Sequence, residues 1–153
     1  MASQAYKSWS VVTASTTAFT VCFMVWMMFA VIGIPIKQNL GLNETQFGVL
    51  VALPVLTGSL IRLPLGMWTD KFGGRIVFFI LMLTTVLPIW MLSWATEFWH
   101  FLFTGLFVGM AGGSFTVGIA YCARWFPKER QGLAMGIFGA GNTGAAVTKL
   151  LAP

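Results

Sequence analysis

The sequence predicts an all-α integral membrane protein, built as a bundle of about five membrane-spanning helices. The chain of 153 residues is 58% hydrophobic and only 8% charged, with a mean hydropathy of +0.84. Soluble domains carry about 25% charged residues. The second observation is that long uncharged runs alternate with short charged connections, and about 20 apolar residues suffice to cross a membrane as a helix. No linker divides these runs, so residues 1–153 form one transmembrane domain.

The five predicted spans are residues 9–33, 46–69, 76–95, 101–123 and 132–152. The first lies between Lys7 and Lys37, and its first half is rich in serine and threonine. Asn43 or Thr45 is expected to cap the second, since short polar side chains accept hydrogen bonds from free amides at helix starts. Pro54 and Pro64 each remove one backbone hydrogen bond from the second span and favour a kink there.

The third span begins after the charged turn at 70–75 and contains Pro88, another expected kink. Trp94 and Trp99 flank the short connection to the fourth span and are typical of the membrane interface. The fourth span ends before the basic sequence RWFPKERQ, and the fifth runs from there to the end of the chain.

The basic residues predict the orientation in the membrane. Two of them, Lys37 and Lys149, fall on one side, and six fall on the other: Lys7, Lys71, Arg75, Arg124, Lys128 and Arg130. Loops rich in lysine and arginine stay in the cytoplasm, so the N-terminus is predicted to be cytoplasmic and the C-terminal end of the fifth span external. The net charge of +5 has the same origin, and without a block of basic residues no nucleic-acid binding is expected.

Neither an enzyme nor a metal or cofactor site is expected. Cys22 and Cys122 lie inside apolar spans without metal-ligand spacing, and such thiols usually behave as small apolar groups. The sequence contains no His/Cys cluster, no Ser-His pair and no carboxylate pair that would indicate catalysis.

Arg62 is the one charged residue between Glu44 and Asp70, roughly 12 Å of helix rise before Asp70. A charge at this depth is costly unless it faces the protein interior or a water-filled path. Its helical face carries Val55, Gly58, Ser59, Leu65, Gly66 and Thr69, most of which are small or polar, whereas the opposite face carries Leu56, Leu60, Leu63 and Met67. This pattern favours an anionic or wet environment for Arg62, with snorkelling to the interface as the alternative.

The sequence from Gly66 to Arg75 has the pattern G-x-x-x-D-K-x-G-x-R, in which Asp70, Lys71 and Gly73 are the other fixed residues. It ends one helix, turns on glycine and places a carboxylate among cations. The pattern and its place after the second span resemble the loop signature of the major facilitator superfamily. The resemblance implies that these charges help to lock a cytoplasmic gate.

The fourth and fifth spans are rich in glycine, which lets helices approach closely. Gly105 occupies the place, four residues before Gly109, where the superfamily often has an arginine, and this departure argues against a proton relay through that arginine. Asn142 in the fifth span is either a hydrogen-bonding group between helices or a ligand contact.

The motifs GAGNTGAA in the fifth span, TGSLIRLPLG in the second and AGGSF in the fourth resemble the nitrate/nitrite porter family of the major facilitator superfamily. The resemblance implies that Arg62 binds the anion, that Asn142 lines the site with the glycines of its motif (Gly139, Gly141 and Gly144), and that Phe115 packs against the planar substrate. For Phe115, plain packing is the alternative. Nitrate or nitrite is then the ligand, with protons as a candidate coupling ion.

Members of that family have about twelve spans and bind the anion between two six-span halves. The resemblance therefore implies that this chain supplies five helices of an N-terminal half in the cell membrane, surrounded by lipid, and that a C-terminal half completes the site. A truncated, non-transporting fragment, a helix-packing partner and a transporter of another small anion remain alternatives. Proton-coupled import and nitrate/nitrite exchange remain open.

Overall fold

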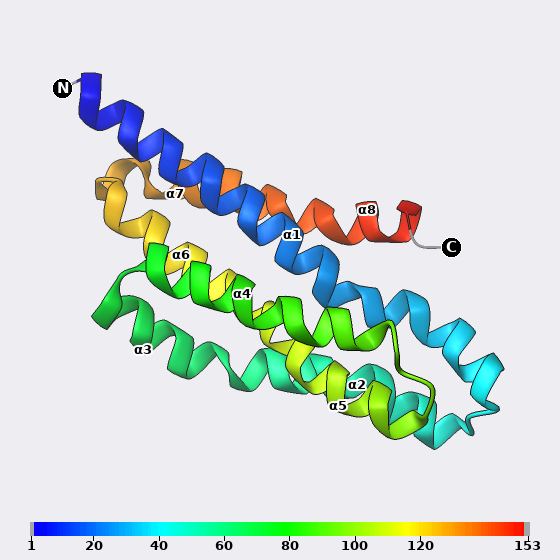
Figure 1. Cartoon of the computed structure of the whole chain (residues 1–153). Helices are drawn as coiled ribbons and strands as arrows, with labels where there is room; N and C mark the ends of the chain where they lie inside the picture. Colours follow the sequence, from blue (N-terminus) through cyan, green and yellow to red (C-terminus); the bar gives the residue numbers. More distant parts are fainter. Residues whose placement is uncertain (1, 152–153) are drawn as a thin grey trace.

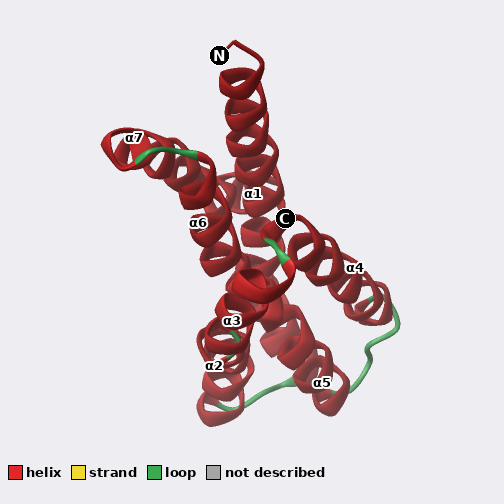
Figure 2. Ribbon diagram, turned by 90° about the vertical axis from the view of Figure 1, so that its left-hand side faces the viewer, coloured by secondary structure: helices red, strands yellow, loops and turns green. Residues whose placement is uncertain are grey.

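The computed structural model describes residues 2–151, and this part of the chain contains only helices and short connections (Figures 1 and 2). An all-helical architecture was predicted and is confirmed. The helices are α1 (Ala2–Leu40), α2 (Glu44–Leu60), α3 (Arg62–Phe72), α4 (Gly74–Leu92), α5 (Phe98–Val108), η1 (Gly109–Gly113), α6 (Ser114–Trp125), α7 (Lys128–Gly139), η2 (Ala140–Thr143) and α8 (Gly144–Leu151).

Four helical stretches of the described chain are long and apolar enough to cross a membrane: Gln4–Leu40, Glu44–Phe72, Gly74–Leu92 and Phe98–Trp125. They overlap the first four predicted spans. The fifth predicted span falls on α7, η2 and α8, which are helical but rich in glycine and carry Asn142 and Lys149. Where the membrane boundaries of the five spans lie stays a prediction.

The connection between the first two spans is shorter than the sequence suggested, because α1 continues through Pro35 as far as Leu40. Gly41 then adopts a φ of 60°, a left-handed conformation that glycine takes without strain. Asn43 caps α2: its Oδ1 accepts from the Gln46 amide at 2.8 Å, and the Gln46 side chain accepts from the Asn43 amide at 3.1 Å. Of the two predicted caps, Asn43 is the one used.

The second span is interrupted at Ile61, between α2 and α3. Proline has no amide hydrogen, so Pro64 leaves the carbonyl of Leu60 without its helical donor. The helix is interrupted at one residue close to Pro64, whereas α2 continues past Pro54 and α4 past Pro88 without a break. Ile61 itself keeps right-handed helical angles, with φ −68° and ψ −16°, so a kink at Pro64 stays a prediction. Arg62 is the first residue of the segment that follows.

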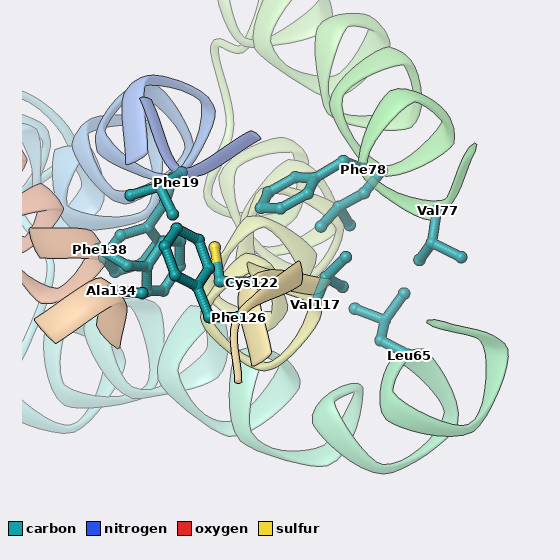
Figure 3. Packing of buried hydrophobic residues seen from close by; sticks show 11 residues of the cluster. Phe19, Leu65, Val77, Phe78, Val117, Cys122, Phe126, Ala134 and Phe138 are labelled. Atoms are coloured by element: carbon teal, nitrogen blue, oxygen red, sulfur yellow. The ribbon is translucent and has the colours of Figure 1, made fainter. Parts of the chain in front are cut away.

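The long helix α1 crosses the bundle and packs against α6, α8 and α2, while α4 packs against α5 and α6 (Figure 1). A buried core joins α1, α3, α4, α6 and α7 (Figure 3) and consists of Val12, Phe19, Leu65, Val77, Phe78, Leu81, Val117, Cys122, Phe126, Ala134 and Phe138. A smaller cluster lies toward the α1–α2 connection and contains Phe29, Ile36, Leu42, Leu50 and Val108. Burial of these side chains holds the helices together.

Glycines bring α2 directly against η1. A Cβ atom on Gly109 would lie 2.6 Å from the carbonyl oxygen of Pro54, and one on Gly58 would lie 2.8 Å from the carbonyl oxygen of Gly109. The indole of Trp26 lies over this contact and packs against Gly58 of α2 and Gly112 of η1. Its Nε1 donates to the Pro54 carbonyl at 3.0 Å. Real Cβ atoms do not fit at such distances, so this crossing of α1, α2 and η1 depends on glycine.

Candidate anion-binding site

Arg62 is the first residue of α3, and its side chain is half-buried. Its Nε is fully buried and has no hydrogen-bond partner among the described residues, and neither ion pair in this part of the chain involves Arg62. A buried donor on a charged group that lacks an acceptor is costly. An anion that accepted this hydrogen bond would remove the cost.

The environment of Arg62 follows from its helical neighbours. Gly58 and Gly66 lie one turn before and one turn after it, and a Cβ atom on them would meet Trp26 and Thr116, respectively. Residues one turn apart share a helical face, so Arg62 lies on the side that faces α1 and α6. The opposite face is exposed, with Leu56, Leu60, Leu63 and Met67 on the outside, as the sequence pattern predicted.

Phe115 lies on α6 within a group of aromatic rings. Its ring centroid is 5.5 Å from that of Phe19 and 6.0 Å from that of Phe138, and Phe19 and Phe138 stack at 4.8 Å. The series continues along α1 from Phe19 through Phe23 to Trp26, with centroids 5.4 Å and 5.3 Å apart. Phe115 therefore packs against other aromatic rings, which is the alternative to a role in substrate binding. It is only half-buried, so the residue remains partly accessible.

The glycine motif of the fifth span has two sides. A Cβ atom on Gly141 would lie 2.5 Å from Phe19 Cδ1, and one on Gly144 would lie 2.5 Å from the carbonyl oxygen of Thr20, so these two glycines lie against α1. A Cβ atom on Gly139 would meet nothing within 4 Å. Gly141 and Gly144 therefore serve close packing, and Gly139 leaves open space.

Asn142 is exposed, and its amide donates to the Gly139 carbonyl in its own helix at 2.8 Å. The hydrogen bond from this segment to α1 comes instead from Thr148, whose Oγ1 donates to the Met24 carbonyl at 3.0 Å. Within the described residues, Asn142 keeps its carbonyl oxygen on an open face. Whether it contacts a ligand stays a prediction.

The predicted gating motif forms the turn between α3 and α4. Gly73 has a φ of 86°, which requires glycine, and Asp70 pairs with Arg124 at the end of α6 at 3.0 Å. Arg124 also donates to the carbonyls of Thr69 and Asp70, at 3.4 Å and 3.1 Å. The guanidinium therefore neutralises the carboxylate and also donates to two carbonyls in the last turn of α3, where a positive charge is favourable.

Lys71 lies beside Phe72, with its Nζ 5.4 Å from the ring centroid, and Arg75 is exposed. Gly66 packs near Thr116 of α6, and Gly74 packs against Tyr121 of the same helix. Gly66, Asp70 and Gly74 thus fasten this turn to α6.

Some of the predicted site lies against the aromatic face of α1. Gly58, one turn from Arg62, meets Trp26, while Gly141 and Phe115 meet Phe19. Sequence reasoning did not single out these α1 residues, although Phe19, Phe23 and Trp26 recur at helical spacing and so signal one face. It also counted Arg124 only as a topology signal and did not recognise it as the partner of Asp70.

In the part of the chain that the structure describes, no three His, Cys, Asp or Glu side chains come together in a metal-binding group. The chemistry available at the candidate site is therefore that of a guanidinium, hydroxyl groups, aromatic rings and open glycine backbone. Such a site can bind an anion without covalent chemistry.

Comparison with known proteins gives a consistent result. The chain is 47% identical over 139 residues to the "Probable nitrate/nitrite antiporter NarK1" of Thermus thermophilus, covering 91% of this chain and 31% of that protein. It is 39% identical over 141 residues to the "Probable nitrate transporter NarT" of Staphylococcus aureus (strain JH9), covering 92% of this chain and 36% of that protein. The chain thus spans about a third of the length of these relatives.

The sequence profile of the Major Facilitator Superfamily matches residues 14–152, which is nearly the whole chain. The match agrees with the apolar helices and with the charged turn between α3 and α4. The resemblance inferred from the motifs is confirmed. This chain is a multi-pass membrane protein and belongs to the major facilitator superfamily.

Proposed function

We propose that this chain forms the N-terminal part of a secondary transporter that carries nitrate or nitrite, and that Arg62 binds the anion. The observation that carries the proposal is the buried Nε of Arg62 without an acceptor. Nitrate and nitrite are small planar anions, and a guanidinium presents a planar fork of donors to them. The names of the relatives support the same substrates.

The remaining site residues are proposed as the surroundings of that anion. Phe115 offers an aromatic face, Asn142 an exposed amide, and Gly139 an open backbone. A second set of helices, supplied by the rest of the transporter, would complete the site. Protons or a counter-transported anion would provide the coupling, and the Asp70–Arg124 pair would belong to the gate.

The test is anion uptake by the full-length protein in liposomes, followed with a nitrate-selective electrode. We expect uptake that nitrite competes with and that sulfate does not, and we expect Arg62→Ala to abolish it. Arg130→Ala, which removes an exposed cation far from the site, should transport as the unchanged protein does. Equal uptake by Arg62→Ala and Arg130→Ala would refute the role of Arg62.

A transporter of another small anion is the second candidate, because the unpaired donor on Arg62 does not by itself select nitrate. The same liposomes distinguish the two. If a different monovalent anion inhibits nitrate uptake at a lower concentration than nitrite does, and Arg62→Ala still abolishes uptake, this alternative is favoured.

We also propose that the protein lies in the cytoplasmic membrane with its N-terminus inside the cell. The turns after α3 and α6 carry most of the basic residues, and the Asp70–Arg124 pair holds these two turns at the same end of the bundle as the start of α1 (Figure 1). Positive loops remain cytoplasmic.

Cysteine labelling tests this orientation after Cys22 and Cys122 are replaced by alanine. A cysteine at the exposed position Lys71 should resist a membrane-impermeant maleimide in intact cells and react after the cells are opened. A cysteine at Glu44, the exposed first residue of α2 at the opposite end of the bundle, should react in intact cells. The reverse pattern would mean that the N-terminus is outside.

A further inference from the structure

An apolar groove runs along α4, and Arg62 is not among the residues that line it. Between α3 and α4 it encloses about 390 Å³. Buried side chains of Leu65, Val77 and Leu81 form its floor, and Figure 3 shows Leu65 and Val77 pointing toward one another there. The upper walls are formed by Trp68, Phe72, Ile76, Ile80, Thr84 and Met110.

The groove continues toward the other end of α4. A second hollow of about 450 Å³ lies between α4 and α5, and it shares Thr84 and Met110 with the first. From Ile76 to Met91 the two hollows follow roughly 22 Å of helix rise. One leaflet contributes about 15 Å of the hydrocarbon core, so an acyl chain of ordinary length fits along this path.

The mouth of the groove is positively charged. Phe72 forms its edge, and the Lys71 Nζ lies 5.4 Å from the centroid of that ring. Asp70, the nearest carboxylate in sequence, is held by Arg124. Lys71 takes no part in the ion pairs of the described chain, so its positive charge next to the groove is available. Arg75 lies elsewhere, because it lines a separate hollow between α4 and α1.

We propose that this groove is a binding site for an anionic phospholipid of the bilayer, with its phosphate at Lys71 and one acyl chain between α3 and α4. Apolar walls alone would accept any lipid, whereas the positive charge of Lys71 at one end selects a negative headgroup. A single basic residue near a membrane surface changes the affinity for anionic lipid roughly fivefold. The site is independent of the transported anion.

The test is native mass spectrometry of the full-length protein with phosphatidylglycerol or phosphatidylcholine, both carrying the same acyl chains. We expect tighter binding of phosphatidylglycerol. Lys71→Gln should lower its affinity roughly fivefold and leave phosphatidylcholine unchanged. Lys128→Gln, which removes an exposed cation at the same end of the bundle but outside the groove, should change neither.

Ile80→Trp fills the groove and should lower the affinity for both lipids at least fivefold. Val86→Trp is the matched control, because Val86 is exposed on the same helix but lines neither hollow. Equal binding by these two tryptophan variants would overturn the acyl-chain site. Equal losses in Lys71→Gln and Lys128→Gln would show diffuse attraction by the basic loops and overturn the headgroup site.

Another helix of the transporter is the competing occupant of the groove. A bilayer-soluble maleimide distinguishes these two occupants. A bound lipid exchanges with the bilayer and lets the reagent reach the groove, whereas a packed helix does not. Cysteines at Ile80 and Val86 should react at similar rates if lipid fills the groove. Reaction at Val86 alone would mean that protein covers it, and the proposal would be wrong.

Discussion

Arg62→Lys is expected to weaken nitrate binding by the full-length transporter roughly 10- to 100-fold, although the charge is kept. A hydrogen bond to a charged group contributes about 1.5–3 kcal/mol, and the lysine ammonium cannot offer the planar pair of donors that a guanidinium offers. The half-buried position of Arg62, with its Nε lacking an acceptor, leaves little water to substitute for the lost bond.

The measurement is nitrate affinity by isothermal titration calorimetry, with uptake in liposomes as the second readout. Arg130→Lys is the matched control, because Arg130 is exposed and lies in the first turn of α7. If lysine at position 62 supports an affinity close to that of arginine, recognition by a planar fork is wrong, and simple charge or snorkelling explains Arg62 better.

Gly141→Leu is expected to abolish transport. It should also lower the free energy of unfolding of the inserted protein by about 1–3 kcal/mol. The first added carbon would lie 2.5 Å from Phe19 Cδ1 and 3.1 Å from the Thr20 hydroxyl. Phe19 is fully buried and stacks on Phe138, so its ring cannot move aside to accommodate the leucine. The better helix propensity of leucine, about 1 kcal/mol over glycine, does not offset this clash.

Gly48→Leu is the control for this substitution. Gly48 lies in α2, and a Cβ atom there would meet nothing within 4 Å, so the variant should insert and unfold like the unchanged protein. Both variants are compared by membrane fractionation and by thermal unfolding in detergent. Near-normal uptake by Gly141→Leu would show that α1 and the fifth span are not tightly packed in the complete transporter.

The sequence predicted what depends on local chemistry. Hydropathy located the apolar helices, Pro64 located the break beside Arg62, and Asn43 with Gln46 marked the start of α2. The predicted inner face of the second span holds only in part: Gly58, Leu65 and Thr69 are buried, whereas Val55 and Ser59 are exposed. Each of these follows from residues close together in the chain.

Contacts between distant residues escaped prediction. Arg124 reaches Asp70 across 54 positions, and Trp26 reaches Pro54 across 28, so neither pairing leaves a local pattern. The hydrogen-bond partner of the Asn142 side chain could not be predicted either, because an amide can bond to a neighbouring helix or to its own. The structure shows that it bonds to its own helix, and that Thr148 makes the hydrogen bond to α1.

The glycine contacts at Gly58, Gly109 and Gly112 have a mechanical consequence. Where backbone lies directly on backbone, two helices cannot slide without losing contact or colliding, since no flexible side chain lies between them to adjust. The Trp26–Pro54 hydrogen bond fixes α1 at the same crossing. A movement that opens a path for an anion is therefore expected to leave this crossing intact. We expect α1, α2 and η1 to rotate together as one rigid body.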